Sequence, residues 1–225
     1  MRMLFATDIE SDVHYADSIF ELVKRNNIVD ESWENPSNCQ HQQAFVNLHN
    51  NDYGLTVANK GLNEYELLND GRNTIAVTLL RCVRELGDWG VFETPDAQCI
   101  GYHEAELKII PHGKDIYDSV KEAHMYQIPV VTKQVDIKNG KINHENGLID
   151  FNGYGIIWST LKMGNNSNKI LRVYNISDKD TSLKISKCEF GKEIYNSNIL
   201  EEEIENIIDS KVNLKKSEIS TISIR

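Results

Sequence analysis

The sequence has 225 residues and a formal net charge of −10, from 24 Lys and Arg against 34 Asp and Glu. An acidic chain repels phosphate groups, and no run of Lys or Arg offsets that repulsion, so we expect no nucleic-acid partner. Hydrophobic residues make up 40% of the chain, as in ordinary globular proteins. No apolar run approaches the length of a membrane span, so we expect no membrane partner either.

Short runs rich in Val, Ile, Thr and Leu follow one another along the chain, separated by turn residues. They cover residues 54–58, 73–83, 104–110, 129–137 and 155–161. Asn-Asp-Gly at 69–71 and Lys-Asn-Gly-Lys at 138–141 predict hairpin turns, because Asn-Gly and Asp-Gly readily supply positive φ. This pattern predicts a mainly β chain that folds as an antiparallel sandwich.

Helical signal is sparse. One short helix is expected over residues 115–126, with Asp115 as its N-cap. Residues 199–208 are rich in Glu, but we predict strand and turn there because the sequence that follows alternates like a strand.

A small polar cluster at residues 163–168, Met-Gly-Asn-Asn-Ser-Asn, has the composition of a linker. Beyond it, residues 169–175, 181–186 and 217–224 again alternate like strands. We therefore expect two domains, a large sandwich over residues 1–163 and a small β-domain over residues 169–225.

The four cysteines, Cys39, Cys82, Cys99 and Cys188, are widely spaced and form no Cys-x-x-Cys pair. We expect four buried free thiols in a reducing compartment. The first residues reach Asp8 too soon for a signal peptide. A cytoplasmic protein is the expectation.

Several phrases stand out in order along the chain. They are Thr-Asp-Ile-Glu at 7–10, His-Tyr-Ala-Asp-Ser at 14–18, Gly-Leu-Thr-Val-Ala-Asn-Lys-Gly-Leu at 54–62, Thr-Pro-Asp-Ala-Gln-Cys at 94–99 and Ile-Leu-Arg-Val-Tyr-Asn at 170–175. Each phrase alone is weak, but the ordered set covers nearly the whole chain. It resembles the C-terminal half of bacterial glycoside hydrolase family 38 α-mannosidases.

The resemblance implies a mutarotase-like antiparallel supersandwich with a small C-terminal β-domain behind it. The family's catalytic domain is an N-terminal α/β barrel that holds zinc, an Asp nucleophile and a carboxylic acid–base for retaining hydrolysis of α-mannosides. That half would precede residue 1, and it and an α-mannoside glycan are the expected partners. This chain offers no His-x-Asp pair and no ligand-spaced histidine cluster. We therefore expect no catalytic residue and no cofactor here, with zinc in the missing domain.

In related enzymes the C-terminal sandwich contributes a loop to the edge of the sugar pocket. By order along the chain, that loop matches Gly87, Asp88, Trp89 and Gly90. An Asp beside a Trp suits a sugar, since the carboxylate accepts from hydroxyls and the indole covers an apolar ring face. The alternative is a tight interdomain turn with Trp89 packed at the interface. Golgi-type relatives carry an Arg before the Gly where this chain has Trp89, so no single contact carries over.

Other polar residues have simpler interpretations. The acidic group Asp8, Glu10, Asp12 and Asp17 could bind a cation, or it could be a solvated edge or a face against the missing domain. Tyr65 is expected to bury its ring while bonding through its hydroxyl. His112 is expected to be a satisfied turn residue at the exit of a strand.

Three functions remain open at this point. The first is the supporting C-terminal part of an α-mannosidase, inactive on its own. The second is a stand-alone carbohydrate-binding sandwich, although Trp33, Trp89 and Trp158 are far apart and show no aromatic platform. The third is an oligomerisation module or homo-oligomer, because a sandwich without its barrel would expose an interface.

Overall fold

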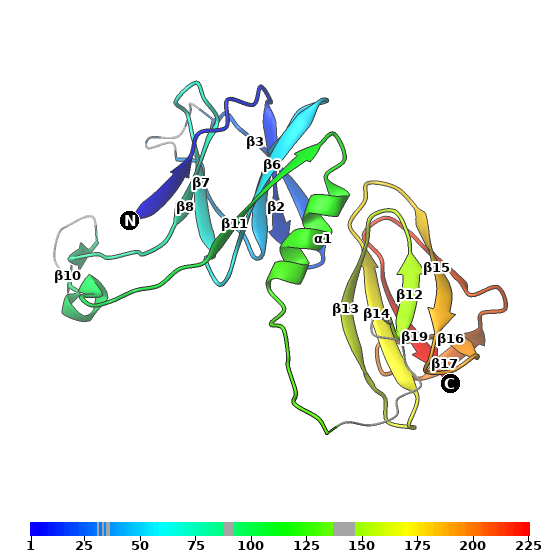
Figure 1. Ribbon diagram of the computed structural model, residues 1–225. Helices are drawn as coiled ribbons and strands as arrows, with labels where there is room; N and C mark the ends of the chain where they lie inside the picture. Colours follow the sequence, from blue (N-terminus) through cyan, green and yellow to red (C-terminus); the bar gives the residue numbers. More distant parts are fainter. Residues whose placement is uncertain (31, 33, 35–36, 88–91, 137–146) are drawn as a thin grey trace. The chain divides into compact units, whose positions relative to one another are not determined.

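The computed structural model describes residues 1–30, 32, 34, 37–87, 92–136 and 147–225. It forms two compact units, Met1–Pro129 and Val130–Arg225. In Figure 1 the first unit runs from blue to green and the second from green to red. Both units are built from antiparallel sheets, so the predicted mainly β class is confirmed.

The first unit is a sandwich of two sheets. The four-stranded sheet has the order β1 (Arg2–Phe5), β8 (Thr74–Thr78), β7 (Glu64–Leu68) and β4 (Cys39–His41). The five-stranded sheet has the order β11 (Leu107–Gly113), β6 (Tyr53–Asn59), β5 (Phe45–His49), β2 (Val13–Ser18) and β3 (Glu21–Asn26). Their inner faces share one core. The five-stranded sheet contributes Ala16, Val46, Leu48 and Val57, and the four-stranded sheet contributes Tyr65, Leu67, Ile75 and Val77.

The other face of the five-stranded sheet is covered by α1 (Tyr117–Tyr126), which contacts β6 and β11 (Figure 1). The predicted helix is therefore confirmed. Asp115 lies one position before the cap residue Ile116, and its Oδ1 accepts the Tyr117 N–H at 2.9 Å. Asp115 thus stabilises the start of the helix, although it is not the N-cap itself.

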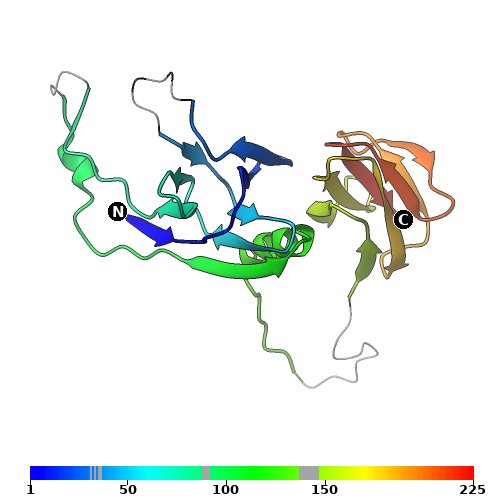
Figure 2. The same ribbon diagram turned by 90° about the horizontal axis from the view of Figure 1, so that it is seen from above.

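A separate arm extends from the first unit. It carries β9 (Glu85–Leu86), β10 (Phe92–Glu93) and the short 3₁₀ helix η1 (Pro95–Gln98). Two extended connections hold it away from both sheets, as both views show (Figures 1 and 2).

The second unit is also a sandwich. Its three-stranded sheet has the order β12 (Ile149–Asn152), β15 (Thr181–Cys188) and β18 (Lys211–Leu214). Its five-stranded sheet has the order β13 (Ile156–Met163), β14 (Lys169–Asn175), β19 (Ile219–Ile224), β16 (Ile194–Ser197) and β17 (Glu203–Asn206). Both sheets contribute to its core, for example through Leu183 and Leu214 on one side and Leu171 and Ile222 on the other.

The division between the units differs from the one expected from the sequence, a boundary between residues 163 and 169. β13 and β14 pair as a hairpin, and the polar cluster is its turn. The Gly164 N–H donates to the Asn168 carbonyl at 2.8 Å, and Asn168 Nδ2 donates to Ser223 Oγ at 2.6 Å. The same small polar residues suit a linker and a tight turn, and here they form the turn. The structure divides the chain at Pro129 and Val130 instead.

Other local expectations have mixed outcomes. The hairpin turn at 69–71 is confirmed, since β7 and β8 pair on either side of it. Strand and turn over 199–208 is confirmed by β17 and the turn before it. Residues 79–83 and 129–136 form no strand, and 137–141 lie outside the described residues.

The cysteines are free, but the expectation that they are buried is wrong. Cys39 and Cys82 are exposed, and Cys99 and Cys188 are partly exposed. Among the described residues, no helix has both the length and the apolar character to cross a membrane.

Candidate functional site

Of the predicted sugar-edge loop, only Gly87 lies among the described residues, in the arm. Gly87 follows β9 with φ +99, and a Cβ at this position would lie 3.4 Å from the Phe92 ring. Asp88, Trp89 and Gly90 lie outside the described residues. The structure therefore places Gly87 but neither the carboxylate nor the indole of this loop.

The base of the arm is held by hydrogen bonds to one carbonyl. Val83 O accepts from Thr94 Oγ1 at 3.0 Å and from Gln98 Nε2 at 3.1 Å. The Thr-Pro-Asp-Ala-Gln-Cys phrase thus closes the arm, while large apolar side chains along it face solvent. The exposed fractions are 55% for Leu86, 60% for Phe92, 96% for Ile100 and 89% for Tyr102.

The acidic residues near the start of the chain do not gather into one site. Asp8 forms a paired contact with the Arg72 guanidinium, at 2.9 Å from Nε and 2.8 Å from Nη2, and this contact lowers the Asp8 pKa. Asp17 is buried elsewhere, against α1. Over the described part of the chain, no group of three or more His, Cys, Asp or Glu side chains is placed to hold a metal, so the acidic group does not form the cation site considered from the sequence.

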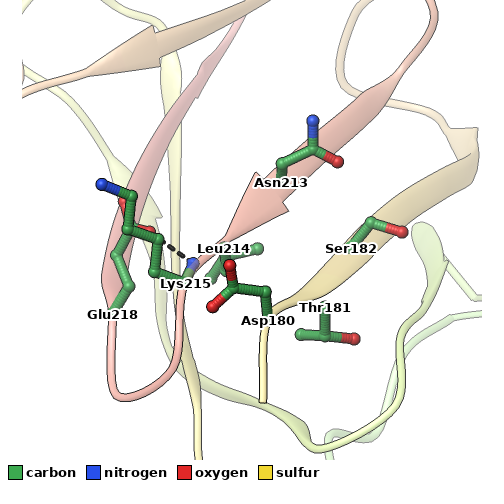
Figure 3. Close-up of a pocket in the computed structure, with 7 residues that line it drawn as sticks. All are labelled: Asp180, Thr181, Ser182, Asn213, Leu214, Lys215 and Glu218. Atoms are coloured by element: carbon green, nitrogen blue, oxygen red, sulfur yellow. Dashed lines mark hydrogen bonds between the residues drawn. The ribbon is translucent and has the colours of Figure 1, made fainter.

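A polar depression of about 650 Å³ lies in the second unit, where β15 begins and β18 ends (Figure 3). Its two carboxylates are already engaged in turns. Glu218 accepts the Lys215 N–H at 2.6 Å, drawn as a dashed line in Figure 3, and Asp180 accepts the Lys216 N–H at 3.0 Å. None of the described residues that line it is aromatic. Its charged groups therefore brace the β18–β19 connection, and we regard the depression as structural.

Tyr65 carries a directed hydrogen-bond chain through the core of the first unit. Arg25 Nη1 donates to Tyr65 Oη at 2.8 Å, and Tyr65 Oη lies 2.7 Å from His14 Nε2. His14 Nδ1 lies 2.8 Å from Asn27 Oδ1. Burial raises the pKa of Tyr65 to about 12 and lowers that of His14. The expected role of Tyr65 is confirmed: its ring is buried and its hydroxyl is bonded.

The face of the five-stranded sheet beneath α1 is unusually polar. Successive side chains of a strand point to opposite faces, and on β2, β5 and β6 the helix-facing set includes Asp17, Asn47 and Thr56. Their exposed fractions are 5%, 0% and 0%. Buried polar groups are costly unless they are paired, so the partners of these side chains decide whether the face is stable.

Asn47 is the centre of the hydrogen bonds in one half of this face. Its Nδ2 lies 2.7 Å from both Thr56 Oγ1 and His112 Nε2, and its Oδ1 lies 2.7 Å from His49 Nδ1. Thr56 Oγ1 in turn lies 2.8 Å from Ser119 Oγ on α1. His112 is therefore a bonded residue within β11 and not a turn residue, which corrects the expectation from the sequence.

The close approach of the two imidazoles depends on a glycine. His112 pairs with Gly54 across β11 and β6. A Cβ at Gly54 would lie 2.4 Å from His112 Cε1 and 2.5 Å from the Cβ of His49. Only a residue without a side chain leaves room for this packing.

Asp17 and His124 occupy the other half of the face. Asp17 Oδ2 accepts the Ala44 N–H at 2.9 Å, and Asp17 Oδ1 lies 3.6 Å from His124 Nε2. Burial raises the pKa of Asp17 to about 6 and lowers the pKa of His124. Although the separation would allow an ion pair, burial favours the neutral form of both groups, because burial penalises charge.

A pocket of about 320 Å³ opens at the edge of this face. We call it the Tyr15 pocket. The Tyr15 ring stacks on His49, with ring centroids 5.0 Å apart. The pocket is lined by Glu10, Ser11, Val13, Tyr15, His49, Asn50, Asn51 and Lys114. Sequence reasoning missed it, because its residues come from distant segments and no local spacing connects them.

Comparison with known families defines the class of the protein. The model for the glycosyl hydrolases family 38 C-terminal domain matches residues 1–97, and the model for the family 38 C-terminal beta sandwich domain matches residues 155–222. Together they span more than half of the chain. The chain belongs to glycosyl hydrolase family 38, and it comprises the C-terminal region of such a protein.

Particular relatives align with the whole chain. A "Putative mannosylglycerate hydrolase" from Halalkalibacterium halodurans is 39% identical over 100% of this chain and 25% of its own length. An α-mannosidase structure from Enterococcus faecalis V583 is 36% identical, with a TM-score of 0.83, over 100% of this chain and 25% of its own. A second family 38 structure from Enterococcus faecalis, also 36% identical, has a TM-score of 0.81 and is covered over 26% of its length. The chain thus spans about a quarter of each relative.

Proposed function

We propose that this chain is the supporting C-terminal part of an enzyme that hydrolyses α-mannosides with retention of configuration. The observation that carries the proposal is the match of the entire chain to the C-terminal quarter of proteins named for mannosylglycerate hydrolysis and α-mannosidase activity. The remaining three quarters would supply the carboxyl pair of a retaining glycosidase and the zinc ion. In that case the chain alone hydrolyses nothing.

The arm of the first unit supports this assignment. Leu86 and Phe92 flank the loop that contains Asp88 and Trp89, and both are more than half exposed, as are Ile100 and Tyr102 nearby. Exposed apolar side chains gathered on one segment are typical of a docking surface. The occupant we infer is the catalytic region of the same enzyme. Docking there would carry Asp88 and Trp89 to the edge of its sugar pocket.

Reconstitution tests this function. The Halalkalibacterium relative without its C-terminal quarter would be mixed with this chain, with zinc present, and hydrolysis of an aryl α-mannoside and of mannosylglycerate would be followed. The relative's own C-terminal quarter, added in the same way, is the matched positive control. We expect no hydrolysis by the chain alone and hydrolysis of one or both substrates by the mixture.

Two results would overturn the proposal. One is hydrolysis by the truncated relative at its full rate without any C-terminal quarter. The other is rescue by the relative's own quarter but not by this chain. In the active mixture, Asp88→Ala and Trp89→Ala then test the loop. A pocket-edge role predicts a raised KM, whereas a purely interfacial turn predicts weaker association with KM unchanged.

A further inference from the structure

We propose that the Tyr15 pocket binds adjacent hydroxyl groups of a neutral sugar or polyol. The proposal does not depend on the proposed enzyme function, because every group it uses lies in the first unit of this chain.

The hydrogen bonds of the network have a fixed direction. His112 Nδ1 lies 2.6 Å from the Gly113 carbonyl, which only accepts, so Nδ1 is the donating ring nitrogen and Nε2 is the accepting one. The amide nitrogen of Asn47 must then face His112, which turns the amide oxygen toward His49 Nδ1. His49 therefore carries its proton on Nδ1, and its Nε2 keeps a free lone pair.

The hydrogen bonds of Ser119 on α1 fix the same donor-to-acceptor direction in the network. Ser119 Oγ donates to the Ile116 carbonyl at 2.7 Å, so it accepts from Thr56 Oγ1. Because the Thr56 hydroxyl donates its proton to Ser119 Oγ, Thr56 Oγ1 accepts the hydrogen bond from Asn47 Nδ2. Both ends of the network finish on backbone carbonyls, and neither can reverse. The network thus leaves one acceptor, Nε2 of His49, whose ring lines the Tyr15 pocket and to which no described residue bonds.

Donors line the rest of the pocket. Asn50 Oδ1 accepts the N–H groups of Asp52 and Tyr53, at 2.9 and 3.0 Å, which leaves Asn50 Nδ2 as the side chain's donor at the pocket. Lys114 is exposed and forms no ion pair with the described residues. A ligand held here must therefore both donate to His49 and accept from Lys114 or Asn50.

Adjacent hydroxyls meet this requirement, because each hydroxyl can donate one hydrogen bond and accept others. A fully deprotonated anion such as sulfate cannot donate to the His49 lone pair, and any inorganic anion, hydrogen phosphate included, would lie close to the Glu10 carboxylate. Val13 and the Tyr15 ring add apolar surface, and a volume of about 320 Å³ is at the lower end of the range for ligand pockets. These properties select a small neutral polyol, such as one sugar ring.

The test is a titration of the 225-residue chain with methyl α-mannoside, followed by the ¹⁵N resonances of the His49 ring. We expect a saturable shift of the Nε2 signal. Lys114→Met, which changes an exposed side chain, should weaken binding about tenfold, as the loss of one hydrogen bond to a charged group would. His49→Phe keeps an aromatic ring against Tyr15 but removes the reporting imidazole, so its titration is followed by calorimetry, and it should abolish binding. Lys121→Met, on the exposed part of α1, is the matched control and should bind as the unchanged chain does.

Three results would overturn the proposal. They are the absence of any saturable shift with methyl α-mannoside or glycerol, tighter binding of inorganic phosphate than of either, and equal weakening by Lys114→Met and Lys121→Met. Because no catalytic region is present and no hydrolysis is measured, failure here leaves the reconstitution result unaffected. Conversely, a failed reconstitution does not alter this titration.

Discussion

At the scale of single residues, Gly54 is the position on which the polar face depends most directly. It lies opposite His112 and beside His49, both bonded to Asn47. Loss of this packing would separate the imidazoles and leave buried amide atoms of Asn47 without partners. An unpaired buried polar group costs free energy comparable to a lost hydrogen bond.

Gly54→Ala should therefore destabilise the chain. The added Cβ would lie 2.4 Å from His112 Cε1, so the rings or the backbone must shift. We expect a loss of about 1–3 kcal/mol in the free energy of unfolding, measured with urea. Gly113→Ala is the matched control, because a Cβ at Gly113 meets nothing within 4 Å. Equal stability of the two variants would contradict the packing described for Gly54.

At the scale of elements, β2, β5 and α1 bury a carboxyl group between strand and helix. The folded-state pKa of Asp17 is raised to about 6 from an ordinary value of 3.8. The folded chain then binds a proton more readily than the unfolded chain between these values, so the Asp17 contribution to stability falls as pH rises from 3.8 to about 6. The lowered pKa of His124 acts in the opposite direction, with stability rising as pH increases toward the ordinary value of 6.5.

Asp17→Asn should stabilise the chain above pH 6. The amide can still accept the Ala44 N–H, but it no longer places a charge beneath α1. We expect a gain of about 1–3 kcal/mol in urea unfolding above pH 6, disappearing as the pH falls below about 4. The His124 contribution is common to both proteins and cancels in the difference. Destabilisation by Asp17→Asn at neutral pH would instead indicate a charged Asp17–His124 pair.

Periodicity in the sequence predicted individual elements well and their partners poorly. The Asn-Asp-Gly turn and the helix near 117–126 follow from local chemistry, and so does the buried ring of Tyr65. Alternation along β5 identifies Asn47 and His49 as one face, but polar residues on one face of a strand usually indicate solvent. Only the tertiary contact with α1 buries them, and no local pattern encodes that contact. Asp88 and Trp89, predicted to contact sugar, stay predictions.

At the scale of the whole molecule, each unit has its own two-sheet core, and the polar cluster at 163–168 lies inside the second unit. The arm belongs to the first unit and exposes apolar side chains, and we propose that it contacts the catalytic region. Ile100 is 96% exposed and Tyr102 is 89% exposed. Their contribution to the stability of the chain itself should be small, since surface substitutions away from packed features change stability by about 0.5 kcal/mol or less.

Ile100→Ser should therefore leave the unfolding free energy nearly unchanged while weakening association with a family 38 catalytic region. We expect at least a roughly tenfold increase in Kd, as for the loss of one buried apolar anchor, measured by titration calorimetry. Ile208→Ser is the matched control: Ile208 is 91% exposed and lies in the second unit, outside the arm. The same Kd for both variants would show that the arm is not part of the interface.

The most direct test of the central claim is the mass of the complex formed when this chain is mixed with the truncated Halalkalibacterium relative, measured by light scattering after size-exclusion chromatography. A supporting C-terminal region predicts a one-to-one complex, as formed by the relative's own C-terminal quarter. If that quarter binds while this chain elutes alone or only as a homodimer, the chain is a stand-alone or self-associating module instead.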